Sequence, residues 1–361
     1  MRTRRPFGIS MAHRFLQAVA LLLTAVALSA CGPGAAPPAG TGPSPAGASE
    51  ADGPSPSAPT GADTEPWRFT DDRGVTVTLP RRPVRIVAQS TAAAALWDLG
   101  IRPVAVFGPQ RRPDGSKEPE IGNVDLSAVE SLGEQWGELD LEKLAALRPD
   151  LIVTTMYQPP SLWYIPDEVR DKVEAIAPTV AIHVAGRPIT EVIDRFEELA
   201  RALGADLNAP QVAAARQRFE QASASLREAI AAKPGLKAMF AGASLETLWV
   251  AVPSWYPDLL YFQQLGLDIV VPEQTDQFYE ALSWEQALKY PADLILYDRR
   301  SYVVPPEELA RKVPTWNQHP AVKAGQVGPW YATAAFSREG FAAIMEELAA
   351  TIRRARADVV D

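Results

Sequence analysis

A single long helical pattern in the middle of the chain limits the available folds more than any other feature. Residues 209–232 are rich in alanine and charged side chains, carry no Gly or Pro beyond the first turn, and end before Pro234-Gly235. At 1.5 Å per residue such a helix spans about 35 Å, the length of a small lobe. The pattern therefore predicts a helix that joins two separate units.

Strand and helix signals alternate on both sides of this helix, after a predicted hairpin at 67–80. Before the helix we expect strands at 84–88, 103–107, 151–155 and 180–183, and helices at 91–99, 141–147, 167–177 and 189–203. After it we expect strands at 236–241, 248–252, 294–297 and 326–328, and helices at 257–265, 284–289, 307–312 and 337–355. Such alternation favours parallel sheets covered by helices on both faces.

The part of the chain with this alternation exceeds the size at which one core usually divides in two, on the order of 250–300 residues. We therefore expect an α/β fold of two Rossmann-like lobes joined by one long helix. The predicted boundaries are 67–207 for the N-terminal lobe, 208–233 for the bridging helix and 234–361 for the C-terminal lobe.

The start of the chain has the three parts of an export signal. Arginines at positions 2, 4, 5 and 14 precede the apolar run 15–28, and small residues lead to Cys31, the only cysteine. The run is shorter than the ~20 residues of a membrane-spanning helix, so residues 1–30 are predicted to be a removable signal peptide. Leu28-Ser29-Ala30-Cys31 resembles the lipobox of bacterial lipoproteins, which implies acylation of Cys31. An ordinary signal peptide with a chance cysteine is the alternative, and the general and twin-arginine export routes both stay open.

Residues 31–66 consist almost wholly of Gly, Ala, Pro, Ser and Thr, which predicts a disordered tether. Removal of residues 1–30 takes away four arginines and no acid, so the formal charge changes from −9 to −13. An acidic surface of this kind does not suit nucleic acid or anionic lipid. Membrane attachment is therefore expected to come from acyl chains on Cys31.

Signatures of catalysis are missing from the sequence. It has no Gly-x-Ser-x-Gly, no His-Glu-x-x-His, no Walker loop and no cysteine pair. Of three histidines, His13 lies in the signal peptide, and His183 and His319 are expected to be structural. We predict a non-enzyme without a cofactor and without direct metal ligands, although residue types alone leave tyrosinate-bound ferric iron open.

Aromatic and arginine residues follow several of the predicted strands. In open α/β sheets, ligands bind beyond the carboxyl ends of the strands. The candidate ligand-binding residues are therefore Gln89, Arg111, Tyr157, Trp255, Tyr256, Arg299, Trp330 and Tyr331, with Trp136 in the loop 133–137. Any one Trp or Tyr is more often a core residue than a ligand contact, so their convergence on one edge carries the prediction.

Four segments, FTDDRGVTVTLPRRPVRIVAQ, LDLEKLAALRPDLIV, LSWEQALKYPADLILY and PAVKAGQVGPWY, resemble the iron-siderophore-binding lipoproteins of ABC importers. That family is related to ferric hydroxamate, haem and cobalamin binders. The resemblance implies a ligand cleft between the lobes, small hinge motion, a ferric siderophore as transported ligand, and permease and ATPase subunits as partners. It also implies a monomer that is lipid-anchored at the extracytoplasmic face of the cell membrane.

The possible ferric siderophores differ in net charge. Three hydroxamates cancel the charge of ferric iron, whereas a tris-catecholate keeps a large negative charge and requires a basic cleft. Few arginines and many aromatics favour hydroxamate or mixed siderophores. Haem, with Tyr157, Tyr256 or Tyr331 as axial ligand, and cobalamin are alternatives, as is a lipid-anchored surface receptor without an importer.

One exposed glutamate on each lobe pairs with permease arginines in the resembling family. The matching positions are Glu142 and Glu285. Each falls in the first turn of a predicted helix, where a carboxylate also stabilises the helix dipole. Permease docking and local stabilisation are thus both open readings of these residues.

Overall fold

The computed structural model describes residues 66–360. The predicted signal peptide, Cys31 and all but the last residue of the predicted tether lie outside this range. Residues from Glu65 onward form one compact unit. Within residues 66–360, no helix combines the length and apolar character needed to cross a membrane.

The first sheet has five strands in the order β5-β4-β3-β6-β7, and every neighbouring pair is parallel. Its strands are β3 (Ile86–Gln89), β4 (Ala105–Phe107), β5 (Glu130–Ser131), β6 (Leu151–Met156) and β7 (Thr179–His183). Its helices are α2 (Ser90–Asp98), α3 (Leu141–Leu147), α4 (Asp167–Ile176) and α5 (Ile189–Ala202), with the 3₁₀ turn η1 (Pro119–Ile121). The predicted alternation is confirmed here.

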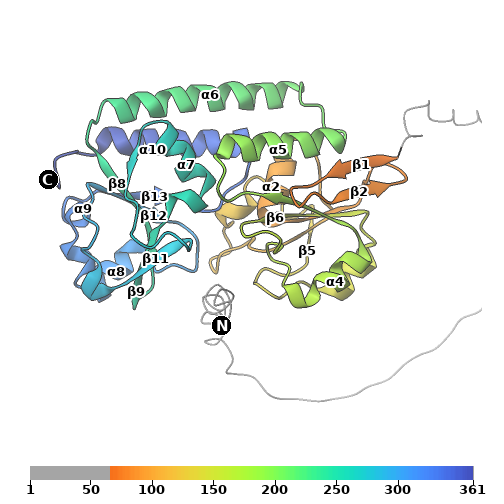
Figure 1. The fold of residues 1–361 in the computed structure, drawn as a ribbon, viewed down its shortest axis with the longest axis horizontal. Helices are drawn as coiled ribbons and strands as arrows, with labels where there is room; N and C mark the ends of the chain where they lie inside the picture. The colour runs from red at the N-terminus through yellow and green to blue at the C-terminus, as the bar shows by residue number, and fades with distance from the viewer. Residues whose placement is uncertain (1–65, 361) are drawn as a thin grey trace, which may run out of the picture. The chain divides into compact units, whose positions relative to one another are not determined.

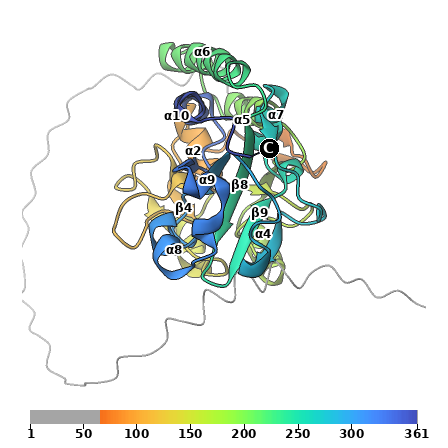
Figure 2. The ribbon, with the colours of Figure 1, turned by 90° about the vertical axis from the view of Figure 1, so that its left-hand side faces the viewer.

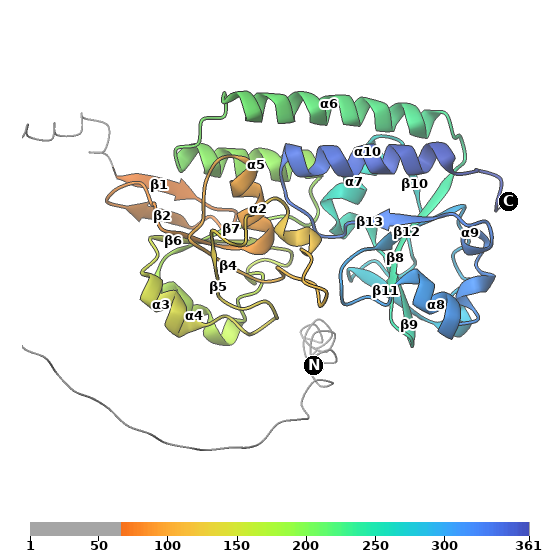
Figure 3. The same ribbon diagram turned by 180° about the vertical axis from the view of Figure 1, so that it is seen from behind.

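Both faces of the first sheet are buried, as expected for a parallel sheet. Side chains alternate along β6, so that Leu151 and Val153 pack on the same core as α2 and α5, while Ile152 packs on the core that includes Leu144 of α3 and Val173 of α4. Figure 3 shows these two helix pairs on opposite sides of the sheet.

The second sheet has six strands and is mixed. Its main order is β11-β9-β8-β12-β13, and β10 pairs with the start of β8. The strands are β8 (Lys237–Ala243), β9 (Thr247–Ala251), β10 (Asp268–Ile269), β11 (Tyr279–Ser283), β12 (Leu294–Asp298) and β13 (Val327–Trp330). Because β9 is antiparallel to both β8 and β11, the prediction of a purely parallel arrangement is wrong for this half.

Helices cover the second sheet on both faces. They are α7 (Pro257–Gln264), α8 (Pro306–Lys312), α9 (Pro320–Lys323) and α10 (Arg338–Arg354), with the 3₁₀ turns η2 (Pro253–Trp255), η3 (Trp284–Gln286) and η4 (Trp316–Gln318). The helix predicted at 284–289 is thus only a single 3₁₀ turn. Trp284, in this turn, is buried and packs against Trp316 with ring centroids 6.5 Å apart.

The long helix α6 (Pro210–Ala231) confirms the central prediction. It packs along α10, and Figures 1 and 2 show α6 lying over both α10 and α5. Its buried residues, Val212, Phe219, Ala222, Ser223, Leu226 and Ala229, recur every three to four positions and form one helix face. One hydrophobic core contains residues from both sheets and from α5, α6, α7 and α10, so the two halves are held together by shared packing.

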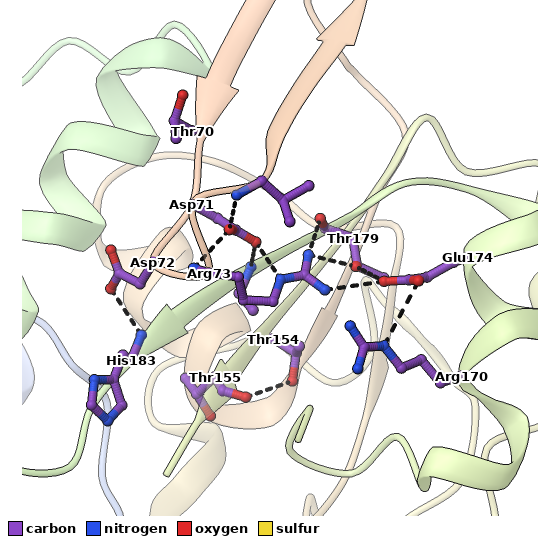
Figure 4. A network of polar contacts seen from close by, with 12 residues as sticks. Thr70, Asp71, Asp72, Arg73, Thr154, Thr155, Arg170, Glu174, Thr179 and His183 are labelled. Atoms are coloured by element: carbon purple, nitrogen blue, oxygen red, sulfur yellow. Dashed lines mark hydrogen bonds and ion pairs between the residues drawn. The ribbon is translucent and has the colours of Figure 1, made fainter. Parts of the chain in front are cut away.

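The N-terminal hairpin, β1 (Trp67–Thr70) and β2 (Thr76–Leu79), is anchored to β7 at its turn (Figure 4). Asp71 accepts hydrogen bonds from the backbone N–H groups of Arg73 and Ala181 at 2.9 and 3.1 Å. The Arg73 guanidinium donates to the Thr179 carbonyl at 2.8 Å and pairs with Glu174 at 3.0 Å. This buried network fixes the hairpin to the edge of the first sheet.

Candidate functional site

Side chains from the two halves meet at a junction that three contacts define. The rings of Tyr157 and Phe278 lie 5.8 Å apart. Thr333 Oγ1 donates to Glu120 Oε1 at 2.8 Å, and Arg112 Nη2 donates to the Arg299 carbonyl at 2.6 Å. Each contact joins residues more than 100 positions apart in sequence, so only the tertiary fold assembles this region.

Aromatic rings run continuously across this junction. On the first half, Trp136 lies 5.7 Å from both Trp163 and Tyr164, and Trp163 lies 4.8 Å from Tyr157. On the second half, Phe278 contacts Trp255 at 4.8 Å and Tyr256 at 6.3 Å. Tyr256 contacts Tyr279 at 5.6 Å and Trp330 at 5.0 Å. We call these nine rings the aromatic ladder: Trp136, Tyr157, Trp163, Tyr164, Trp255, Tyr256, Phe278, Tyr279 and Trp330.

Backbone and side-chain hydrogen bonds fix the ladder rings. The Trp163 backbone N–H donates to the Thr155 carbonyl at 2.9 Å, and the Trp163 carbonyl accepts from Thr154 Oγ1 at 2.7 Å. The next residue, Tyr164, has φ +63°, a left-handed conformation that is costly for a residue with a side chain. On the second half, the indole N–H of Trp255 donates to the Thr275 carbonyl at 3.1 Å. These contacts fix the backbone at Trp163 and the indole ring of Trp255.

A buried ion pair lies beside the ladder. Arg300 Nε lies 2.9 Å from Asp298 Oδ2, and Arg300 Nη2 donates to the Tyr279 hydroxyl at 2.7 Å. The guanidinium also stands 4.8 Å from the ring centre of Tyr302. Burial by itself lowers the pKa of Arg300, but the Asp298 carboxylate raises it well above its ordinary value, so Arg300 carries a permanent charge.

Carboxyl groups balance this charge. Glu118, Glu120 and Asp258 are each nearly fully buried. Burial raises the pKa of Glu120 to about 7, although the Arg300 charge opposes the shift. Burial likewise raises the pKa of Asp258 to about 7. The hydrogen bond of 2.8 Å that Trp330 Nε1 donates to Asp258 Oδ2 lowers this pKa but does not offset the effect of burial. The junction is thus rich in acids and contains few cations.

The structure brings five of the predicted ligand-binding residues together in the ladder, namely Trp136, Tyr157, Trp255, Tyr256 and Trp330. Trp255 and Tyr256 arrive by an unexpected route, because they follow the carboxyl end of the antiparallel strand β9. Their position depends on the turn η2 and the start of α7. The rule that ligand residues follow parallel strands therefore does not account for them.

The side chains of the other four predicted residues do not join the ladder. Gln89 is fully buried as the N-cap of α2, where its Oε1 accepts from the Thr91 backbone N–H at 3.0 Å. Arg111 is exposed, and its backbone N–H donates to Glu134 at 3.0 Å. The side chains of Arg299 and Tyr331 line a separate hollow of about 400 Å³, in which the Tyr331 hydroxyl donates to Glu347 at 2.9 Å.

Several junction residues were not among the candidates. In each arginine pair the side chain of the other member reaches the junction: Arg112 rather than Arg111, and Arg300 rather than Arg299. Trp163 and Tyr164 lie in a loop well past β6, and Phe278 and Tyr279 border the unpredicted strand β11. The aromatic run Leu-Trp-Tyr at 162–164 was the available sequence signal for the first pair.

The histidines have structural surroundings. His319 is buried, caps α9 and lies 3.1 Å from the Tyr290 carbonyl through Nε2. Burial lowers the pKa of His319, which favours the neutral ring. Among residues 66–360, no group of three or more His, Cys, Asp or Glu side chains is placed to hold a metal ion.

The two predicted docking glutamates occupy equivalent places in the two sheets. Glu142 lies in the first turn of α3, which precedes β6, and Glu285 lies in η3, which precedes β12. Both are exposed. β6 and β12 each pair in parallel with the first strand of their half, β3 and β8.

Comparison with known proteins gives a consistent assignment. A family model described as periplasmic binding protein matches residues 87–332. The solved structure of DesE, a ferric-siderophore receptor protein from Streptomyces coelicolor, is 40% identical, covers 81% of this chain and 99% of that chain, and superposes with a TM-score of 0.77. The Fe(3+)-citrate-binding protein YfmC of Bacillus subtilis is 24% identical over 71% of this chain and 76% of its own length. The FhuD protein from S. pseudintermedius, at 20% identity and a TM-score of 0.58 over 81% of this chain and 99% of its own, shares the fold.

The matched segment begins in β3 and ends just after β13, so it takes in both sheets, α6 and all nine ladder rings. The two-sheet architecture and the family match thus agree, and the chain belongs to the periplasmic binding protein family.

Proposed function

We propose that this protein captures a ferric siderophore at the junction between its two halves and delivers it to an ABC importer. The aromatic ladder is the observation that carries the proposal, because its partly exposed rings, among them Trp163 on the first half and Trp255 on the second, offer broad apolar faces to one ligand. The likeness to DesE, a ferric-siderophore receptor protein, supports it, as does the name of YfmC, an Fe(3+)-citrate-binding protein.

Hydroxamate or mixed siderophores fit the charges at the junction better than catecholates. Arg300 is already paired with Asp298, and Arg112 faces Glu118. Burial of a highly anionic chelate next to these carboxylates would add repulsion in a region of low dielectric. A chelate with a net charge near zero avoids that cost.

A titration of the purified protein tests the ligand class. Tryptophan fluorescence is followed during addition of a ferric trihydroxamate, a ferric tris-catecholate, haem or cobalamin, since four ladder tryptophans report on the junction. We expect saturable quenching first with the trihydroxamate, with Kd between micromolar and nanomolar. Binding of haem or cobalamin alone would replace the ligand assignment and keep the protein a transport receptor of another kind.

We propose two further features of the delivery step. Glu142 and Glu285 dock the loaded protein on the two permease halves, supported by their exposure and equivalent positions. Acylated Cys31 holds the protein at the extracytoplasmic face of the membrane. The Bacillus subtilis protein YhfQ, a putative ABC transporter substrate-binding lipoprotein that is 31% identical over 37% of this chain and 39% of its own length, supports the lipid anchor and the partnership with an importer.

Cell fractionation tests the anchor. Cys31→Ala is expected to release the protein from membranes or leave it unprocessed, and membrane retention of a signal-cleaved Cys31→Ala form would contradict lipidation. Saturable siderophore binding without any import by cells would instead favour a surface receptor that works without an importer.

A further inference from the structure

Two neighbouring acids of the junction have oxygen atoms that the fold leaves without hydrogen bonds. Glu118 and Glu120 are each only 4% exposed. Within residues 66–360, Oε2 of Glu118 and Oε2 of Glu120 have no hydrogen-bond partner. A buried carboxylate oxygen without a donor is costly, so such atoms require an explanation.

Nearby cations pair with the acids without donating a hydrogen bond to these oxygens. Arg112 Nε, itself without a hydrogen-bond partner in residues 66–360, forms an ion pair with Glu118 Oε2 at 3.6 Å, and Nη2 of the same side chain donates to the Arg299 carbonyl. Arg300 is engaged by Asp298 and by the Tyr279 hydroxyl. Glu120 receives one hydrogen bond, from Thr333, on its other oxygen. Each acid therefore keeps acceptor capacity that the described residues do not fill.

Hydrogen bonds connect both acids to the elements that carry the ladder. Thr333, which donates to Glu120, accepts at 3.5 Å from Nη1 of Arg300, the side chain that donates to Tyr279 of the ladder. The Gln110 carbonyl accepts from the Glu118 backbone N–H at 3.0 Å, and Gln110 Nε2 donates at 3.3 Å to the Gly133 carbonyl, in the loop that carries Trp136. Both acids thus belong to the junction at which the ligand is proposed to bind.

The loop that carries the acids has a fixed shape. It begins at Gly108, whose φ of +93° favours glycine, and a Cβ there would come within 3.4 Å of the Tyr164 ring and 3.1 Å of Gln89 Nε2. A backbone hydrogen bond of 3.0 Å from Glu118 to Gln110 closes the loop. Gln89 Nε2 is itself buried without a partner in the described chain. The loop that carries the acids thus starts against the Tyr164 ring and against another polar atom without a partner.

We infer that Glu118 and Glu120 form a carboxylate subsite that selects ferric chelates carrying a protonated amine at their periphery. An ammonium group supplies three donors and a positive charge, which matches two acceptor oxygens in an acid-rich wall. Charge-assisted hydrogen bonds of this kind are about twice as strong as neutral ones. The inference rests on the proposed function and narrows it to chelates with a cationic arm.

Two chelates that differ in one group test the inference. A linear ferric trihydroxamate with a terminal ammonium is compared with its N-acetyl derivative, which keeps the iron centre and removes the charge. We expect the wild-type protein to prefer the ammonium form at least tenfold in Kd. Glu118→Gln/Glu120→Gln should reduce this preference to less than twofold while binding of the N-acetyl form changes less than threefold. Glu228→Gln, the same change on the exposed face of α6, should keep the full preference.

The outcomes separate the two claims. Equal affinity of the wild-type protein for both chelates would overturn the subsite and leave siderophore binding intact, and this measurement does not depend on any variant folding. An unchanged preference in a folded double glutamine variant would also overturn it. Failure of the wild-type protein to bind either chelate would remove both the subsite and the proposed ligand class.

Discussion

The protonation of Glu120, a junction residue, affects the free energy of unfolding of the protein. Its carboxyl is buried, accepts a hydrogen bond from Thr333 of the other half, and has its pKa raised by burial to about 7. An unfolded glutamate titrates near 4.3. The folded protein therefore binds more protons than the unfolded chain between these values, and its stability decreases as the pH rises through them.

Glu120→Gln should reverse part of this dependence. The amide has nearly the same shape and never ionises, so the free energy of unfolding of the variant relative to wild type should be higher at pH 8 than at pH 5. The difference in free energy of unfolding between variant and wild type should change by at most about 1.4 kcal/mol per pH unit between the two pKa values. Thermal unfolding at both pH values measures it, with Glu228→Gln as the baseline. A relative stability that is the same at pH 5 and pH 8 would show that Glu120 does not titrate in this range.

At the residue scale, the sequence indicates residue types better than individual positions. Aromatics at Tyr157, Tyr256 and Trp330 could be predicted because they follow strand or turn signals. The choice between Arg299 and Arg300 could not, because it depends on which side chain turns back to Asp298 and toward Tyr279. Glu120 carries no local signal at all, since it is buried in contact with Thr333 of the other half of the chain.

At the element scale, α6 and α10 act as a paired support for both sheets. Leu226 is fully buried on the inner face of α6, whereas Arg218 on the same helix is partly exposed and pairs with Glu339 at 2.9 Å and Glu346 at 2.8 Å. The contributions of buried packing and of exposed ion pairs to stability can therefore be compared on one helix.

Leu226→Ala should lower the free energy of unfolding by about 3 kcal/mol, because it removes buried methyl groups and leaves a cavity. Arg218→Ala should cost less than about 1 kcal/mol, since exposed ion pairs contribute little. Urea unfolding of both variants measures the contrast. A larger loss from Arg218→Ala than from Leu226→Ala would mean that charge rather than packing attaches α6 to α10.

Element prediction from sequence succeeded where periodicity was long and failed where it was short. The pattern of α6 extends over six turns without interruption, and the actual helix differs by one residue at each end. Strand β11 was not predicted because a polar segment precedes it. The five residues of β9 likewise contain no pattern that distinguishes an antiparallel from a parallel strand. Strand direction is a property of pairing, so local sequence does not specify it.

At the scale of the whole molecule, the two halves share one core and form one compact unit, so the proposed ligand site and the proposed docking glutamates lie on the same unit. Glu142 and Glu285 lie at equivalent positions relative to the two sheets. Their side chains are exposed, so substitution should affect partners more than folding.

Glu142→Arg with Glu285→Arg should nearly abolish siderophore uptake by cells, because attraction to permease arginines becomes repulsion. Each single Glu→Ala change should reduce uptake only partly. Ligand affinity and melting temperature of the purified double variant should match wild type. Unchanged uptake would remove both residues from the docking surface, and a loss of folding would assign them to local helix stabilisation.

The central claim is that the ligand lies on the aromatic ladder, and the affinity of a ferric trihydroxamate for two tryptophan variants tests it most directly. Trp163 is a half-buried ladder ring, and Trp97 is a half-buried ring on α2 that stacks with Arg102 outside the ladder. We predict that Trp163→Ala weakens binding at least tenfold, about 1.4 kcal/mol, while Trp97→Ala stays within twofold of wild type. Equal affinities for wild type and a folded Trp163→Ala would contradict a ligand site on the ladder.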